Sequence, residues 1–326
     1  MAYVAGDTIT ATEFNTFVTS SSSPFGYNHF AGTGSTVYGL GQTAIAAVTG
    51  GATTVTAAQF NSLMTGIINI ADHCQDTGNI TARTQVTAGD TIAIKSAIAA
   101  DLATLAASVA AGSPNATDLT TSSALQTITS GSEGWNATAI QDVIATFANG
   151  NNMRFFFNGG GKIRISLDTV AAATSDKDTA FANLCTSIGN LDIASLATTR
   201  SGSGETLTTN GLGLGFQDLT TSYQTIIKLT SDNSNYTSNF IEIEAKTVGG
   251  NGNSGDATAL NIKMTASDAA ADTAFDSNNL SSVATTAKDT PKMVTKLFTI
   301  APNTDGGLST VYTVSATSSA TNSVND

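Results

Sequence analysis

Short stretches in the C-terminal part of the chain alternate between apolar and polar residues, and this pattern restricts the possible folds more than any other feature. Ile241, Ile243 and Ala245 alternate with charged residues, and residues 260–264 alternate in the same way. A period of two is that of a β-strand with one buried face. At least five such short strands are separated by loops rich in Gly, Asn and Asp; the others are residues 225–229, 297–300 and 311–314. The pattern predicts an antiparallel β-sandwich over residues 201–316, with one solvated face on each sheet.

A helix-start motif occurs twice in the N-terminal part of the chain. Thr10 is followed three residues later by Glu13, and Thr56 is followed by Gln59 at the same spacing. In such a capping box, each side chain binds a backbone N–H group that the first helical turn leaves without a partner. We therefore expect helices to begin near residues 11 and 57, and an Ala-rich stretch predicts a third that ends near residue 111. Residues 1–112 are predicted to form a small helical unit for docking and oligomerisation.

Four aromatic residues lie between the first two predicted helices, on a Ser- and Gly-rich segment that we expect to be irregular. They are Phe25, Tyr27, Phe30 and Tyr38. Aromatic side chains on such a loop are typical anchors for another subunit. The alternative is that they fold back and pack within their own domain. With both interpretations open, these four are the candidate subunit-interface residues.

The middle of the chain combines helix and strand signals, so residues 113–200 are predicted to form an α+β unit. A hairpin is predicted from Met153–Phe157, through the glycine-rich turn at residues 158–161, to the alternating stretch 162–167. A helix is predicted over residues 175–188, and a strand over residues 125–129. The Ser-, Thr- and Asn-rich tail, residues 317–326, is predicted to be flexible unless a neighbour holds it. The whole chain is therefore expected to be α+β.

The charge content excludes several classes of protein. Charged residues make up 12% of the 326 residues, with a formal net charge of −12, whereas Ser and Thr make up roughly a quarter. Lys and Arg total 13, and none precedes Arg83, so the chain lacks the basic surface with which proteins bind nucleic acid. No stretch is long and apolar enough to span a membrane, and no secretory signal is visible. We expect neither a nucleic-acid nor a membrane partner, and release by cell lysis.

Histidine and cysteine are too scarce for most metal and nucleophile chemistry. His29 and His73 are the only histidines, and Cys74 and Cys185 are the only cysteines. This supply argues against a disulfide scaffold and against a zinc site. A Cys–His nucleophile pair has no local support, so Cys185 is predicted to be a buried, inert thiol.

Two further patterns resemble ligand sites only superficially. Residues 250–255 match Gly-x-Gly-x-x-Gly, but a strand pattern follows them instead of the helix that a dinucleotide site needs. This stretch therefore predicts a hairpin loop. Asp268, Asp272 and Asp276 are spaced to line one face of a helix, where they could collect a cation, although no calcium-loop pattern is present.

A glycan site would have to use Trp135 and the paired carboxylates. Glu242 and Glu244 share one strand face with Lys246, which is more typical of a solvated sheet face than of an acid/base pair. A single Trp more often belongs to a core or an interface than to a sugar platform. We assign no catalytic, cofactor-binding or metal-binding residue, and expect no cofactor.

Several short segments of the sequence resemble virion structural proteins of marine tailed phages, especially those that infect cyanobacteria. These segments are residues 3–10, 27–42, 153–166, 215–226 and 236–246. The resemblance covers most of residues 1–250 and fades in the C-terminal quarter. It implies a virion component present in many copies, assembled in the host cytoplasm and released by lysis, and it carries no catalytic residue with it.

The sequence thus predicts a non-enzymatic, self-assembling virion protein, an appendage or tail/neck fibre component. Its expected partners are copies of itself and other virion proteins, with a host-surface glycan as a further candidate. A capsid decoration protein is the alternative within the particle. The alternative from another class is a glycan-binding adhesin or depolymerase.

Overall fold

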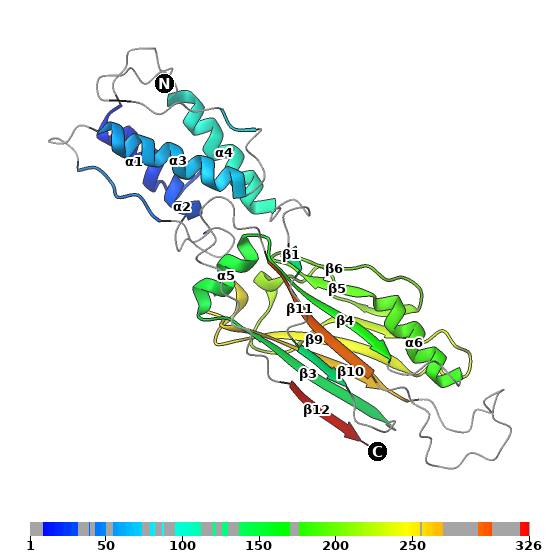
Figure 1. Ribbon diagram of the computed structural model, residues 1–326. Helices are drawn as coiled ribbons and strands as arrows, with labels where there is room; N and C mark the ends of the chain where they lie inside the picture. Colours follow the sequence, from blue (N-terminus) through cyan, green and yellow to red (C-terminus); the bar gives the residue numbers. More distant parts are fainter. Residues whose placement is uncertain are drawn as a thin grey trace, which may run out of the picture. The chain divides into compact units, whose positions relative to one another are not determined.

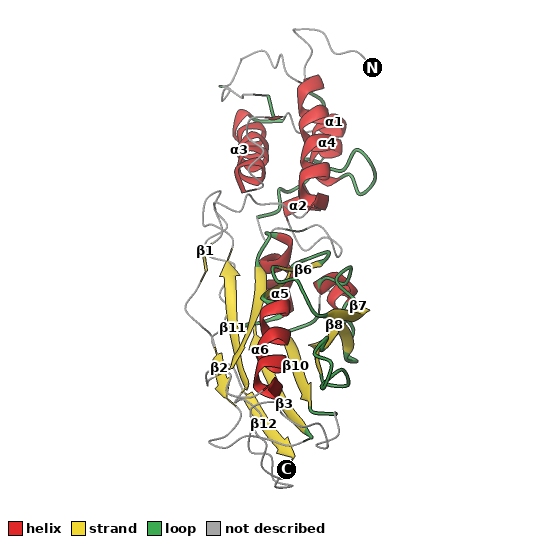
Figure 2. Cartoon of the chain, turned by 90° about the vertical axis from the view of Figure 1, so that its right-hand side faces the viewer, coloured by secondary structure: helices red, strands yellow, loops and turns green. Residues whose placement is uncertain are grey.

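The computed structural model describes residues 9–31, 39, 43–49, 55–73, 79–81, 87, 95–111, 120–121, 126–129, 137–169, 176–254, 256–269, 293–301 and 320–325. The chain forms two compact units, each built from several segments. Unit 1 comprises Met1–Thr120, Asn151–Gly161 and Ala301–Thr313, and unit 2 comprises Thr121–Gly150, Lys162–Ile300 and Val314–Asp326. Most described residues of unit 1 are helical, and most described strand residues belong to unit 2 (Figures 1 and 2).

Unit 1 contains the two helices that the capping boxes predict, the predicted Ala-rich helix, and a short helix in the segment expected to be irregular. They are α1 (Ala11–Thr19), α2 (Tyr27–Ala31), α3 (Ala57–His73) and α4 (Lys95–Ala111). The Thr10 hydroxyl accepts from the Glu13 N–H at 3.2 Å, and the Glu13 carboxylate accepts from the Thr10 N–H at 2.7 Å. Thr56 and Gln59 make the equivalent pair at 3.2 and 3.0 Å. Both predicted capping boxes are confirmed.

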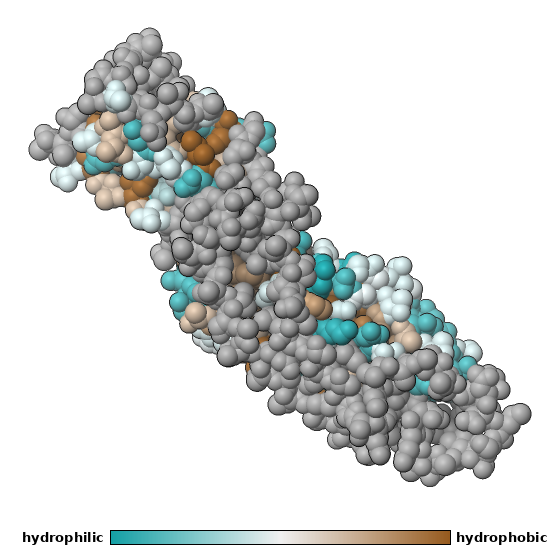
Figure 3. All heavy atoms as spheres, viewed as in Figure 1, coloured by the Kyte–Doolittle hydropathy of each residue, from teal (hydrophilic) through white to brown (hydrophobic). Residues whose placement is uncertain are grey.

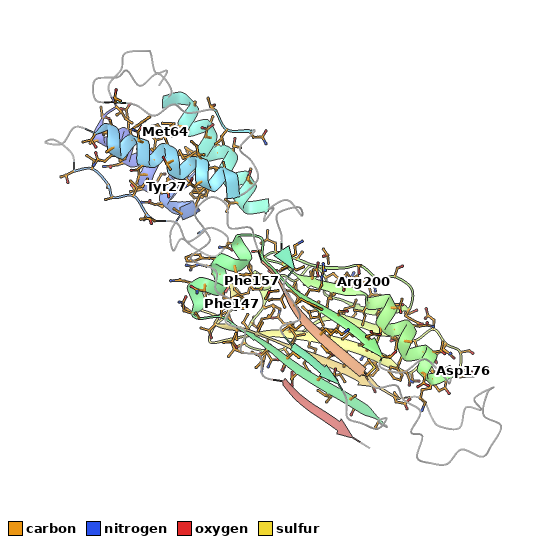
Figure 4. The ribbon with its side chains drawn as sticks, viewed as in Figure 1. Tyr27, Met64, Phe147, Phe157, Asp176 and Arg200 are labelled. Atoms are coloured by element: carbon orange, nitrogen blue, oxygen red, sulfur yellow. The ribbon has the colours of Figure 1, made fainter. Side chains whose placement is uncertain are left out.

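The apolar faces of these helices meet in one hydrophobic core. Its fully buried members include Phe14, Phe30, Phe60, Leu63, Ile67 and Leu105. Tyr27 and Met64 lie among the helices of this core in Figure 4. The core thus draws on α1, α2, α3 and α4 together, as expected for helices that each bury one stripe.

In the described part of the chain, unit 2 contains two six-stranded sheets with antiparallel pairing, so the chain is α+β as predicted. The first sheet, named the β4 sheet, has the strand order β1-β11-β4-β5-β6, and β2 also pairs with β11. Its strands are β1 (Thr120–Thr121), β2 (Gln126–Thr129), β4 (Lys162–Thr169), β5 (Asn190–Ile193), β6 (Thr198–Arg200) and β11 (Met293–Ala301). The second, named the β9 sheet, has the order β12-β3-β10-β9-β8-β7; its strands are β3 (Thr138–Thr146), β7 (Thr206–Asn210), β8 (Gln224–Thr230), β9 (Phe240–Val248), β10 (Ala259–Ser267) and β12 (Ala320–Asn325). Helix α6 (Asp176–Ile188), predicted from the sequence, contacts β4 of one sheet and β8 and β9 of the other.

A buried polar side chain links the two sheets. Gln141 on β3 is fully buried, and its Nε2 donates to the Met293 carbonyl of β11 at 3.1 Å. The Thr295 hydroxyl, also on β11, donates to Gln141 Oε1 at 2.6 Å. Both ends of the amide are therefore satisfied, which a buried amide requires.

The predicted hairpin over residues 153–167 is wrong in its first half. Gly150–Asn158 forms helix α5, and β4 pairs with β5 and β11 instead. The glycines end the helix: Gly160 has φ 88°, its N–H donates to the Phe157 carbonyl, and the Gly161 N–H donates to the Phe156 carbonyl. This is a Schellman cap, which uses the same positive-φ glycine as a hairpin turn. Residues 153–158 are all buried, so they lack the alternation that marks a half-buried strand.

Two predicted boundaries also differ from the structure. Strands from both sides of residue 200 pair with one another, as β3 does with β10 and β4 with β11, so residue 200 does not separate two folding units. The predicted flexible tail contains β12, which pairs with β3 from Ala320 opposite Val143 to Asn325 opposite Thr138. Six residues of polar composition suffice for a strand here because β3 supplies a regular edge. The predicted strand at residues 311–314 lies outside the described residues.

Candidate functional site

The outward side of the β9 sheet gathers many of the charged residues of unit 2. On β9 the buried residues Ile241, Ile243 and Ala245 alternate with partly exposed ones, as the sequence predicts. The outward side carries two aromatic and six charged side chains, and we name it the charged face: Asp142, Tyr223, Lys228, Phe240, Glu242, Glu244, Lys246 and Lys263. These residues come from β3, β9, β10, β8 and the residue before β8.

Acidic and basic side chains alternate across neighbouring strands of this face. Lys263 on β10 lies opposite Glu244 on β9, and their Nζ and Oε2 atoms are 2.5 Å apart. Lys228 on β8 lies opposite Glu242, with a distance of 3.5 Å. The Thr225 hydroxyl also donates to Glu242 Oε1 at 2.9 Å. Three acidic and three basic residues make the face neutral in sum, and each partly exposed pair is worth about 0–1 kcal/mol.

Tyr223 joins three strands on the charged face. Its hydroxyl donates to Asp142 Oδ1 on β3 at 2.8 Å. The ammonium groups of Lys246 and Lys263 each lie 4.3 Å from its ring centroid, which is cation–π distance. Burial, followed by the hydrogen bond to Asp142, raises the pKa of the phenol, so Tyr223 stays protonated at every physiological pH. Phe240 is covered similarly, with Lys228 Nζ 3.7 Å from its ring centroid.

The sequence identifies only part of this face. Glu242, Glu244 and Lys246 were predicted to share a solvated strand face, and the structure places them there with lysines against the carboxylates. Tyr223 and Asp142 were not singled out. Their signal is weak because β3 carries Ile outward and Gln141 inward, which obscures its period of two. Trp135, the other residue proposed for a glycan site, lies outside the described residues.

The structure decides between the two interpretations of the aromatic segment for two of its four residues. Tyr27 is 3% exposed and Phe30 is 0% exposed within the single chain, so neither presents surface to a second subunit. The segment predicted to be irregular forms α2 and packs on α3, where a Cβ at Gly66 would come within 2.5 Å of the Tyr27 ring. Tyr27 and Phe30 are therefore core residues, and their prediction as interface anchors is corrected. They are buried because α2 presents their large apolar rings to the core that it shares with α1, α3 and α4.

Phe25 and Tyr38 have a different status from these two core residues. Phe25 is partly buried and stacks on His29, with ring centroids 3.9 Å apart and an interplanar angle of 4°. Tyr38 lies outside the described residues. Of the four candidate interface residues, Phe25 is therefore the one in the described part of the chain that keeps exposed surface.

Acid should destabilise unit 1 through His29. Burial lowers the pKa of His29 below its ordinary value of 6.5, so the unfolded chain binds a proton more readily than the folded one. This contribution to stability is present above the ordinary pKa and is lost as the pH falls through the lowered value. We expect thermal unfolding followed by circular dichroism at 222 nm to show a larger loss between pH 7.5 and pH 5 in the wild type than in His29→Gln. An equal loss in both would show that other groups carry the dependence.

The remaining candidate residues do not form a ligand site in the described part of the chain. Cys185 is buried, and burial, assisted by Asp168, raises the pKa of its thiol to about 12, as expected for an inert core cysteine. Asp268 follows β10 and pairs with Lys177, while Asp272, Asp276 and Cys74 lie outside the described residues. Among the described residues no group of three His, Cys, Asp or Glu side chains could hold a metal ion.

The glycine-rich stretch after β9 is a hairpin loop, as predicted. It connects β9 to β10, which pair antiparallel, and contains a short 3₁₀ turn at Gly252–Ser254. Among the described residues of this stretch no α-helix begins that could receive a pyrophosphate, and β10 is the next element. At Gly252 an added Cβ would lie on top of the Phe216 carbonyl oxygen, so close packing explains this glycine.

No protein-family model, curated protein or solved structure matches this chain. Where the chain is described, none of its helices combines the length and the apolar character needed to cross a bilayer.

Proposed function

We propose that this chain is a non-enzymatic structural protein of a phage virion that self-assembles in many copies. Within the particle we favour an appendage or a tail/neck fibre component, assembled in the host cytoplasm and released by lysis. The resemblance of several short segments within residues 1–250 to structural proteins of marine phages supports the virion part of the proposal. The supporting geometric observation is the charged face of the β9 sheet.

The charged face suits contact between identical copies because four of its six charges form ion pairs within the chain, while Asp142 and Lys246 contact Tyr223. Asp142, Glu242 and Glu244 offset Lys228, Lys246 and Lys263, so two such faces meet without a net like charge. Partly exposed pairs that keep their own partners avoid the cost of stranding an unpaired charge on burial. Figure 3 shows the other side of unit 2, where β4 and β11 lie in front of β9, and the described residues seen there are also mostly hydrophilic or intermediate in hydropathy. Such a surface is compatible with reversible, repeated packing.

We also propose that the two sheets of unit 2 pack face to face as a sandwich. The hydrogen bonds from Gln141 on β3 to Met293 and Thr295 on β11 support this arrangement, because side-chain bonds of 3.1 and 2.6 Å require adjacent sheets. A sandwich would give the assembly a rigid module whose outward face is free for contacts.

Self-assembly is tested on the purified full chain by light scattering coupled to size exclusion, and by negative-stain microscopy. We expect species larger than the 33.0 kDa monomer that change little between low and high salt, because the face is neutral. A monomer at every accessible concentration would contradict self-assembly.

The virion role is tested separately with a gold-labelled antibody against the chain on lysate particles. Label at the tail or neck is the expected result. Label over the capsid would favour a decoration protein, and unlabelled particles would contradict a virion role.

A further inference from the structure

The two edge strands of the β9 sheet differ in regularity. Strand β7 pairs with β8 through a bulge between Leu207 and Thr209, whereas β12 pairs with β3 without interruption from Ala320 to Asn325. Bulges twist an edge and block pairing with another strand. In Figure 1, β12 lies beside β3 at the outer edge of this sheet. Among the described residues no strand pairs with the outer side of β12, although β2 comes near it.

The hydrogen-bond pattern shows which backbone groups of β12 point away from β3. The Phe147 N–H donates to the Thr258 carbonyl, and the Asp268 N–H donates to the Ala137 carbonyl, so odd-numbered residues of β3 direct their backbone groups toward β10. Even-numbered residues therefore direct theirs toward β12.

The pairing register between β12 and β3 then shows which way the backbone N–H and C=O groups of β12 point. Residues 321, 323 and 325 lie opposite even-numbered residues of β3 and bond to them, whereas residues 320, 322 and 324 direct their backbone groups outward. The outward groups recur every second residue, which is the spacing that a further strand needs. On β7 the same reasoning leaves Leu207 and Asn210 outward, three residues apart, which a regular strand does not match.

The sequence of β12 carries none of the usual devices that prevent edge pairing. Ala-Thr-Asn-Ser-Val-Asn contains no Lys, no other charged residue and no Pro. Solvent-exposed edges of monomeric proteins normally include such residues, or are very short. The edge strand β6 of the other sheet has three residues and includes Arg200. In the β9 sheet the charges lie on the interior strands instead.

We propose that β12 pairs antiparallel with β12 of a second copy about a twofold axis, which joins the two β9 sheets into one continuous sheet. Asn322 would lie opposite its own counterpart, and Ala320 opposite Val324, so that the outward N–H and C=O groups bond reciprocally. A twofold axis through Asn322 places this residue opposite its symmetry mate and brings the two copies of the same short strand together, and a strand without charge makes this contact without repulsion. The proposal rests on the proposed self-assembly and names one of its interfaces, which is separate from the charged face.

Proline at position 322 tests the interface without touching the bonds between β12 and β3. Asn322→Pro removes an outward N–H, whereas Asn322→Ala retains it and is the matched control. Asn210→Pro makes the equivalent change at the outward edge of β7. We expect Asn322→Pro to weaken self-association, measured by sedimentation equilibrium, by about 30-fold, because two symmetry-related hydrogen bonds are lost. Asn322→Ala and Asn210→Pro should associate like the wild type.

The possible outcomes separate the interface from self-assembly itself. Association that is lost in Asn210→Pro and retained in Asn322→Pro would assign the contact to β7 and overturn the proposal. Association that survives both prolines would also overturn it but leave self-assembly intact, whereas a monomeric wild type would contradict both. If Asn322→Pro fails to fold, hydrogen exchange of wild-type residues 320–325 gives the answer: protection should rise with protein concentration, and concentration-independent exchange would overturn the proposal.

Discussion

Replacing Lys177 by Met should lower the free energy of unfolding of unit 2 by about 3–5 kcal/mol. Lys177 on α6 and Asp268 after β10 form a buried ion pair, with Nζ and Oδ2 2.7 Å apart and side chains only 7% and 1% exposed. Removal of the ammonium would leave the Asp268 carboxylate buried without its counter-ion. The Oδ1 atom of Asp268 accepts no hydrogen bond from the described residues, so no hydrogen bond there offsets the loss of the ammonium group. Urea unfolding followed by hydrogen exchange and mass spectrometry reports unit 2 separately.

Two control variants make this prediction specific to burial. Lys177→Met combined with Asp268→Leu should recover most of the loss, since an apolar pair of similar volume replaces both charges. Lys228→Met breaks the partly exposed pair with Glu242 and should cost no more than about 1 kcal/mol. A cost below about 1 kcal/mol for Lys177→Met alone would show that water reaches the pair.

Phe30→Ala should destabilise unit 1 by about 3–5 kcal/mol, because it removes a fully buried ring from a close-packed core. Phe30 lies edge-to-face against Phe25 and His29, with ring centroids 6.3 and 5.5 Å away, so the cavity has rigid walls. Urea unfolding measured by circular dichroism at 222 nm checks the result. The same substitution distinguishes a core residue from a docking residue.

Phe25→Ala is the matched control for this measurement, since Phe25 is only partly buried. It should cost less than about half as much as Phe30→Ala. If Phe30→Ala leaves unit 1 stable and weakens self-association instead, the aromatic segment acts as the docking element that the sequence first suggested.

The success of the sequence-based predictions depended on how local the signal was. The capping boxes at Thr10 and Thr56 involve residues three apart, so they predicted the starts of α1 and α3 correctly. The alternation around Ile241 predicted β9 and its buried face for the same reason. The stretch Met153–Phe157 was misjudged because β-prone aromatic residues also suit a helix that is buried on several sides.

Strand β3 shows the limit of pattern reasoning most clearly. Its buried positions include Gln141, a residue that a pattern search places on the surface. Burial is tolerated because Met293 and Thr295, about 150 positions away in the chain, supply partners for both ends of the amide. No window of the sequence around Gln141 contains that information.

By itself, the sequence determined where α1 and α3 begin, which positions of β9 are buried, and that Glu242, Glu244 and Lys246 share one outward face. These properties follow from backbone periods of 3.6 and 2, which a short segment expresses alone. Tertiary structure decided that Tyr27 and Phe30 fill a core, that Lys228, Lys263 and Tyr223 complete the charged face, and that the C-terminal residues form β12 on the edge of β3. A period defines the face of an element but not the element against which that face packs, because the partners lie far apart in the chain and meet only on folding.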